Sequence, residues 1–445
     1  MSNTNTPGVW SFFLIFKAGS GNLLTDPQVM TSPTLERGLF GGGNSGRFFE
    51  KFPEQHVCSG YCKFFGLSSL IDMSSAYQHI IPGLHTFSGE YLLLTMSAPP
   101  PTHETIDLGP LLGVPRLWCG LWQLSSNAWG SAPVSKIRKS MGDTVDRGFT
   151  AFDMCFPADH YGSAEIIFGQ FRKSCGTHPD LVVGATKWCV FKTIIPDRTT
   201  VEAAVRERML RMQSEKVDLL QFHWQDYEDK GYLTALEILD ELRSDGLITA
   251  LGLCNFDAIR TDEICTHLGP GVIVSNQIQF SLIDTRPLHG MTDVCSRHGI
   301  KLLTYGTLCG GFLSDRWLGQ PAPDLYSGDL TPSQRKYLDM ILKAWGSWAL
   351  FQTLLRCLRD IADEHGFDVS IANIATRWVL DQPGVGAVLV GARLGITSHL
   401  EDNLRVFSPA CKLTEQDNHK IEVVLAQSHG RRMITTIGDC GAEYR

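Results

Sequence analysis

The feature that most constrains the fold is an alternation of short apolar runs with longer amphipathic stretches, which begins near Leu111. Runs that are apolar throughout are typical of parallel strands buried on both faces, and amphipathic stretches between them indicate covering helices. The predicted strands are Arg116–Leu121, Thr150–Asp153, Leu181–Thr186, Val217–Phe222, Ala250–Leu253, Val272–Asn276, Lys301–Thr304 and Ala387–Val390. The predicted helices include Val134–Arg147, Val201–Ser214, Leu233–Ser244, Ala258–Leu268, Leu288–His298 and Gln352–His365. Eight such units predict a (β/α)8 TIM barrel of class α/β over residues 106–445 rather than an open sheet.

The first part of the chain has a different character, since Gly and Ser are frequent and no long period appears before Met96. Residues 1–105 are therefore predicted to be a disordered or irregular N-terminal extension that ends in the Pro-rich stretch Ser97–Thr102. The run Gly41–Gly46 formally satisfies G-x-G-x-x-G, but no predicted strand precedes it and no βαβ unit surrounds it. We interpret it as a loop rather than a dinucleotide fingerprint.

Charge and composition exclude several classes of function. The formal net charge is −8, which argues against nucleic acid as a partner because phosphate binding needs a basic surface. No run of 18 apolar residues occurs, so no membrane partner is expected. Thirteen cysteines are scattered through the chain, and Cys58 and Cys62 have no second pair to complete a zinc site. The sequence predicts a cytoplasmic protein with reduced thiols and no metal, and it leaves the oligomeric state open.

Polar side chains stand where the predicted strands end. In a barrel of this kind the active site lies at the carboxyl ends of the strands. The residues expected to meet at this mouth are Asp153, Lys187, His223, Asn255, Gln277 and Tyr305. Trp188 and Trp224, which directly follow two of them, are candidates to line a substrate pocket.

Four residues in this region form a set suited to proton transfer: Asp153, Tyr161, Lys187 and His223. A phenol can protonate a carbonyl oxygen if a neighbouring ammonium favours the phenolate. A carboxylate holds that ammonium in place, and a histidine beside the same oxygen can orient the carbonyl and stabilise developing charge.

In the order and spacing of its motifs the chain resembles the aldo-keto reductase family over nearly all of the predicted barrel. The matching segments are Phe152-Asp153, Asp159-His160-Tyr161-Gly162-Ser163-Ala164-Glu165, Thr186-Lys187-Trp188, Asp218-Leu219-Leu220-Gln221-Phe222-His223-Trp224, Gly252-Leu253-Cys254-Asn255-Phe256, Asn276-Gln277-Ile278-Gln279, Tyr305-Gly306-Thr307-Leu308, Gly391-Ala392-Arg393 and Leu400-Glu401-Asp402-Asn403-Leu404.

The resemblance implies an NADP-dependent oxidoreductase that reduces a small-molecule aldehyde or ketone with NADPH, giving NADP+. It implies that Asp153, Tyr161, Lys187 and His223 are the catalytic tetrad, with Tyr161 as general acid. The positions implied to bind the cofactor are Cys254, Asn255 and Gln277 at the carboxamide, Tyr305 stacked on the nicotinamide, Leu308 and Gly310 along the pyrophosphate, and Arg393, Asp402 and Asn403 around the adenosine. A guanidinium at Arg393 suits a 2′-phosphate, which favours NADPH.

One departure from the family pattern lies inside the predicted site. Tyr161 follows Asp153 by eight positions rather than the usual five, which makes Cys155-Phe156-Pro157 an insertion. Either these residues bulge outward and leave Tyr161 in place, or they displace Tyr161. In the second case the protein would be an NADPH-binding regulatory barrel or a catalytically impaired one. The sequence leaves both alternatives open.

Overall fold

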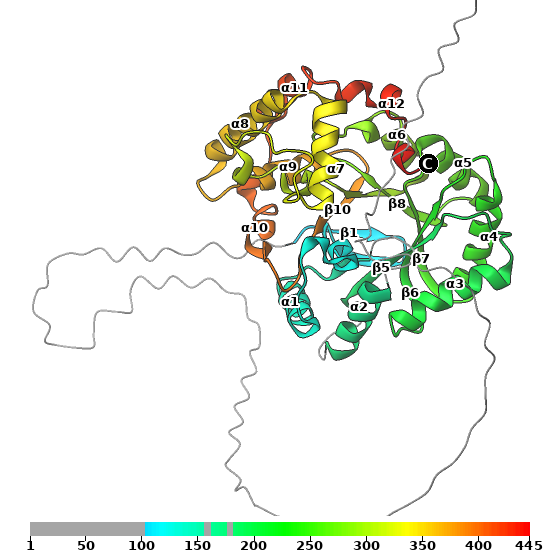
Figure 1. The fold of residues 1–445 in the computed structure, drawn as a ribbon. Coiled ribbons are helices and arrows are strands. Elements are labelled where there is room, and N and C mark those ends of the chain that lie inside the picture. Colours follow the sequence, from blue (N-terminus) through cyan, green and yellow to red (C-terminus); the bar gives the residue numbers. More distant parts are fainter. Residues whose placement is uncertain (1–102, 155–161, 176–180) are drawn as a thin grey trace, which may run out of the picture. The chain divides into compact units, whose positions relative to one another are not determined.

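The computed structural model describes residues 103–154, 162–175 and 181–445 (Figure 1). Residues 1–102 of the predicted N-terminal extension, with Gly41–Gly46, Cys58 and Cys62, lie outside the described residues, and Thr105 at its predicted end already belongs to a strand. Tyr161 and the insertion Cys155-Phe156-Pro157 also lie outside the described residues.

Eight parallel strands close into a barrel in the order β10-β3-β4-β5-β6-β7-β8-β9, so the predicted TIM barrel is confirmed. The barrel strands are β3 (Leu117–Gly120), β4 (Ala151–Asp153), β5 (Val183–Val190), β6 (Val217–Trp224), β7 (Ile248–Cys254), β8 (Ile273–Gln279), β9 (Lys301–Tyr305) and β10 (Val385–Gly391). Each predicted strand overlaps one of them. The ladder between β5 and β6 is the longest, and it extends past the predicted strand ends, since Lys187 pairs with Gln221 and His223 pairs with Cys189 within it.

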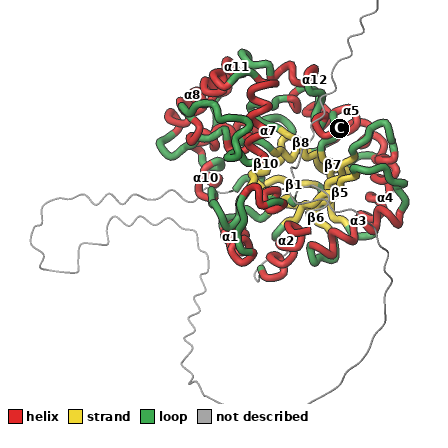
Figure 2. The backbone as a smooth tube through the Cα atoms, in the orientation of Figure 1, coloured by secondary structure: helices red, strands yellow, loops and turns green. Residues whose placement is uncertain are grey.

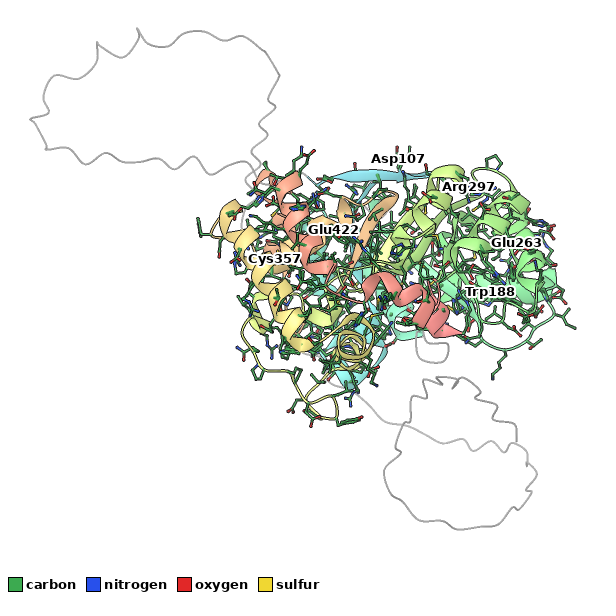
Figure 3. The ribbon with its side chains drawn as sticks, turned by 90° about the horizontal axis from the view of Figure 1, so that it is seen from above. Asp107, Trp188, Glu263, Arg297, Cys357 and Glu422 are labelled. Atoms are coloured by element: carbon green, nitrogen blue, oxygen red, sulfur yellow. The ribbon has the colours of Figure 1, made fainter. Side chains whose placement is uncertain are left out.

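A layer of helices surrounds the strands, as Figure 2 shows. The helices are α1 (Val134–Asp146), α2 (Gly162–Ser174), α3 (Arg198–Arg211), α4 (Gly231–Ser244), α5 (Ala258–Leu268), α6 (Met291–His298), α7 (Pro332–Met340), α8 (Trp348–His365), α9 (Ile371–Leu380), α10 (Leu400–Arg405), α11 (Glu415–Leu425) and α12 (Met433–Thr436). Apolar side chains between this layer and the strands form the main core. Trp188, labelled in Figure 3, belongs to it and packs on Phe222, with ring centroids 5.3 Å apart.

A second core fills the inside of the barrel. Small residues such as Ala151, Ala185 and Ala250 point inward and pack with larger ones such as Trp118. A hairpin of β1 (Thr105–Leu108) and β2 (Leu111–Pro115) contributes Leu108 and Val114 to the same cluster. Because the hairpin directly precedes β3, it closes the end of the barrel where the strands begin and leaves the opposite end to the polar side chains.

None of the described helices is long and apolar enough to cross a bilayer.

Candidate active site

A buried ion pair lies at the carboxyl ends of β4 and β5. The Lys187 Nζ atom is 2.8 Å from both carboxylate oxygens of Asp153 and also donates to the Met154 carbonyl oxygen at 3.2 Å. Both side chains are almost fully buried, at 6% and 2% exposure. Alternation along a strand explains the placement, because Ala185 and Lys187 share the inward face of β5 while Trp188 faces the helices.

Two glutamines complete the surroundings of this carboxylate. Gln221 Nε2 donates to Asp153 Oδ1 at 2.7 Å, and Gln277 Nε2 donates to the same oxygen at 2.8 Å. Gln277 Nε2 also lies 2.8 Å from Gln221 Oε1. The sequence analysis did not single out Gln221, although it lies two residues before His223 and therefore faces inward with it.

His223 is held by the backbone of the next strand, with its Nδ1 atom 2.9 Å from the Cys254 carbonyl oxygen. A carbonyl can only accept, so Nδ1 carries the proton and Nε2 has a lone pair. Burial lowers the pKa of His223 to about 4, and the hydrogen bond to Cys254 opposes this shift only in part. His223 is therefore neutral at physiological pH.

Asn255 and Tyr305 lie on the other side of the mouth. Asn255 directly follows β7 and has φ +59°, a left-handed conformation that asparagine tolerates better than most residues. The Tyr305 hydroxyl donates to Asn255 Oδ1 at 2.9 Å. Two predicted cofactor residues from different strands are thus brought together.

The loop after β9 carries Leu308 and Gly310. Gly310 has φ +66°, and a Cβ at this position would lie 3.0 Å from the Gln334 nitrogen in the first turn of α7. Only glycine allows this approach of the loop to α7. Trp129 Nε1 donates to Ser333 Oγ at 3.1 Å and joins the loop after β3 to the same helix.

The predicted adenosine end follows β10. Arg393, His399 and Asn403 line one cavity between α1 and α10, which lie side by side in Figure 1. Asp402 points elsewhere, since its Oδ2 accepts from Ser370 Oγ at 3.2 Å and its Oδ1 lies 3.5 Å from Arg405 Nη1. Of the three residues predicted around the adenosine, Arg393 and Asn403 therefore share a cavity, whereas Asp402 fixes α10 to the start of α9.

Comparison with known proteins identifies this arrangement. The family model described as the aldo/keto reductase family matches residues 116–426. The chain belongs to the aldo/keto reductase family.

Individual members of the family show how far the similarity reaches. The aldo-keto reductase YhdN of Bacillus subtilis is 26% identical over 291 residues, which is 62% of this chain and 81% of that protein. Among solved structures, a glycerol dehydrogenase from Gluconobacter oxydans has a TM-score of 0.55 at 23% identity over 74% of this chain and 95% of its own. An aldo/keto reductase from Klebsiella pneumoniae in complex with NADP and acetate has a TM-score of 0.54 at 17% identity over 73% and 96%. The two structural likenesses show the fold alone.

The barrel of this aldo/keto reductase fixes the segment next to Tyr161, although Tyr161 itself lies outside the described residues. Helix α2 begins at Gly162, and Glu165 in its first turn is buried. Thr186 Oγ1 donates to Glu165 Oε1 at 2.5 Å, and Arg211 Nη1 lies 3.3 Å from Oε2. The start of α2 is thus tied to the residue that precedes Lys187.

The prediction that Trp188 and Trp224 line a substrate pocket is wrong. Both belong to the core between strands and helices, and Trp224 Nε1 donates to the Asp229 carbonyl oxygen at 2.9 Å. The physical reason is again the alternation along the strand, which turns the neighbours of inward-facing Lys187 and His223 outward.

The sequence analysis missed a group of residues that approach Asn255 and Tyr305 from late in the chain. Tyr444 contacts Tyr305, Lys336 contacts Tyr444, and the Arg445 guanidinium contacts the Asn255 carbonyl oxygen. The polar run Asp284-Thr285-Arg286, which begins five residues after the end of β8, was a signal for part of this group, because Arg286 is buried and binds the same late segment. Among the residues described, no cluster of His, Cys, Asp and Glu could hold a metal ion.

Proposed function

We propose that this aldo/keto reductase is an NADPH-dependent enzyme that reduces a small-molecule aldehyde or ketone to the alcohol, with Tyr161 as general acid. The observation that carries the proposal is the buried Lys187–Asp153 pair at the mouth of the barrel, beside a neutral His223. Burying a charge pair costs desolvation free energy, and apolar residues in its place often stabilise a fold equally well or better. The presence of the pair therefore points to a functional role.

Lys187 supplies a fixed positive charge for Tyr161. Because Asp153 Oδ1 accepts from Lys187, Gln221 and Gln277, the carboxylate is held and the ammonium with it. An ammonium beside a phenol favours the phenolate and so makes proton donation easier. The tie between Glu165 and Thr186 supports this role for Tyr161, since it anchors the segment just after Tyr161 next to Lys187.

His223 contributes an acceptor rather than a charge. With its proton on Nδ1, the Nε2 lone pair can accept a hydrogen bond from the hydroxyl of Tyr161 or of the alcohol. The residue thereby orients the oxygen at which the proton is exchanged.

The residues at the mouth fit a nicotinamide carboxamide. The Asn255 Oδ1 atom accepts a hydrogen bond from Tyr305, which leaves Nδ2 available as a donor to the carboxamide. Gln277 uses Nε2 for Asp153 and Gln221, which leaves Oε1 as an acceptor. A carboxamide offers the complementary C=O and NH2 groups. When bound, the cofactor supplies the hydride for the carbonyl carbon.

The choice of NADPH over NADH rests on Arg393. Among the described residues Arg393 forms no ion pair, and it lines the cavity shared with His399 and Asn403. A guanidinium there can bind a 2′-phosphate with two hydrogen bonds. Cys254, Leu308, Gly310 and Asn403 are proposed as the other contacts. We propose that Asp402 acts indirectly, by fixing α10 to the start of α9.

The test is loss of NADPH absorbance with a panel of aromatic and aliphatic aldehydes and ketones. We expect turnover by the full chain, and a loss of at least about 100-fold in Tyr161→Phe because the general acid is removed. Tyr326→Phe, which removes an exposed phenol, is the matched control and should be unchanged. NADPH binding without turnover in the wild type would instead identify a cofactor-binding regulatory barrel. Turnover that persists in Tyr161→Phe would remove Tyr161 from the mechanism.

A further inference from the structure

The last residues of the sequence, 438–445, dock on the mouth of the barrel, and we call them the tail. The tail lies beside α5 and β8 in Figure 1. Arg286 is the anchor: it is 1% exposed, pairs with Asp284 at 2.7 Å, and holds Glu443 through both Nη atoms at 3.0 Å. The Ala258 nitrogen at the start of α5 donates to Asp439 Oδ2 at 2.9 Å. A buried arginine that spans two carboxylates fixes the tail against the barrel.

The tail also packs directly against the backbone of Asn255. A Cβ at Gly441 would lie 2.2 Å from the Asn255 carbonyl oxygen, and Gly441 has φ +78°. The Arg445 guanidinium donates to the same oxygen at 2.5 Å. The left-handed backbone of Asn255 is therefore held by contacts from the tail.

A chain of hydrogen bonds links the tail to the Asn255 side chain. Lys336 Nζ is 2.5 Å from the Tyr444 hydroxyl, which is 3.1 Å from the Tyr305 hydroxyl, which is 2.9 Å from Asn255 Oδ1. An ammonium only donates and an amide oxygen only accepts, so the two ends set the direction. Tyr305 gives its single proton to Asn255, Tyr444 gives its own to Tyr305, and Lys336 donates to Tyr444.

Lys336 also holds the rings of this chain together. Its Nζ atom lies 4.8 Å from the ring centroid of Tyr444 and 5.7 Å from that of Tyr305. Cation–π contacts at this range add to the hydrogen bond. Tyr305 is thus restrained at its hydroxyl by Tyr444 of the tail and at its ring by Lys336 of α7.

We propose that Tyr444 and Lys336 are positioning residues for the nicotinamide half of the cofactor site. Through Tyr305 they orient the Asn255 amide so that Oδ1 points away from the carboxamide and Nδ2 points toward it. They also hold the Tyr305 ring in place. The inference rests on the proposed function, because it assigns the tail to the same cofactor site.

The test is equilibrium binding of NADPH to the full chain, followed by quenching of tryptophan fluorescence, with no substrate present. Tyr444→Phe removes one hydroxyl and leaves the anchor of Glu443 on Arg286 intact. We expect its Kd to rise about 5-fold, the effect of one neutral hydrogen bond. Lys336→Met should raise Kd about 5- to 10-fold, and the double variant should add little, because both changes break the same chain. Tyr326→Phe is the control for loss of a phenol.

A thermodynamic cycle separates positioning from general loosening. In an Asn255→Ala background, Tyr444→Phe should change Kd by less than about 2-fold, since the group that it positions is gone. A Kd in Tyr444→Phe equal to the wild-type value, or an equal loss with and without Asn255, would overturn the inference while the proposed function stands. Failure of the wild type to bind NADPH at all would overturn both.

Discussion

The mouth of this barrel has two sides that are built in different ways. One side, which we call the floor, consists of Asp153, Lys187, Gln221 and Gln277, all on strands and joined through one carboxylate. The other side, which we call the wall, consists of Asn255, Tyr305, Lys336 and Tyr444, which come from a strand end, loops, a helix and the tail. The floor is set by alternation along neighbouring strands, whereas the wall exists only when distant segments dock. We therefore expect changes at Asp153 and Lys187 of the floor to affect turnover, and changes in the wall to affect cofactor affinity.

The largest expected effect comes from breaking the floor. Lys187→Met should lower kcat by at least about 100-fold, because it removes the charge that assists proton donation. It should also lower the free energy of unfolding by about 3–5 kcal/mol, since it leaves the Asp153 carboxylate buried without its partner. Initial rates and chemical denaturation measure the two effects. Lys412→Met, at an exposed lysine, is the control, and turnover of Lys187→Met within 10-fold of the wild type would contradict the role of the floor.

The second prediction concerns Arg286, which anchors the tail. Arg286→Met leaves Asp284 and Glu443 without their buried cation, so we expect a loss of about 3–5 kcal/mol in the free energy of unfolding and release of the tail. Limited proteolysis with mass spectrometry should show faster cleavage within residues 438–445. Arg431→Met, which removes an exposed arginine paired with Glu422, serves as the control. A tail that remains protected in Arg286→Met would show that other contacts hold it.

A smaller effect should appear in the pH dependence of stability. The folded-state pKa of His223 is lowered to about 4 from an ordinary 6.5, so below pH 6.5 the unfolded chain binds the proton first. The contribution of His223 is fully present above pH 6.5 and is lost as pH falls, up to about 3 kcal/mol near pH 4. Denaturation curves of the wild type and His223→Gln between pH 7 and pH 4 measure this difference. Parallel pH dependences would contradict a neutral, buried His223.

The smallest expected effect lies away from both sides of the mouth, at the adenosine end. Arg393→Met should reduce the preference for NADPH over NADH by about 10- to 100-fold, the effect of losing hydrogen bonds from a charged group. The ratio of kcat/KM for the two cofactors is the measurement, with Lys412→Met as the control. Arg393→Lys should recover only part of the preference, because an ammonium cannot bind a phosphate in bidentate fashion. An unchanged ratio would remove Arg393 from cofactor recognition.

The same two sides explain how much could be predicted from the sequence. The barrel and three of the four floor residues followed from apolar runs that end in Asp153, Lys187 and Gln277, because strand ends of a barrel must meet. Gln221 was missed because it lies inside β6 rather than at its end. The conformations of Asn255 and Asp402 could not be predicted, since each is set by a contact with a segment elsewhere in the chain. Tyr444 and Lys336 carried no signal in the sequence, because no period or spacing connects a tail to a strand. The position of Tyr161 stays a prediction.

In the proposed reaction this barrel transfers a hydride from a nicotinamide to a carbonyl carbon. The most direct measurement uses NADPH deuterated at C4 of the nicotinamide with an aldehyde that is turned over, followed by mass spectrometry of the alcohol. We expect one deuterium on the carbinol carbon of the product, and a greatly reduced yield in Lys187→Met. Alcohol formed without deuterium from either C4-labelled epimer, or cofactor consumed without alcohol, would contradict this reaction.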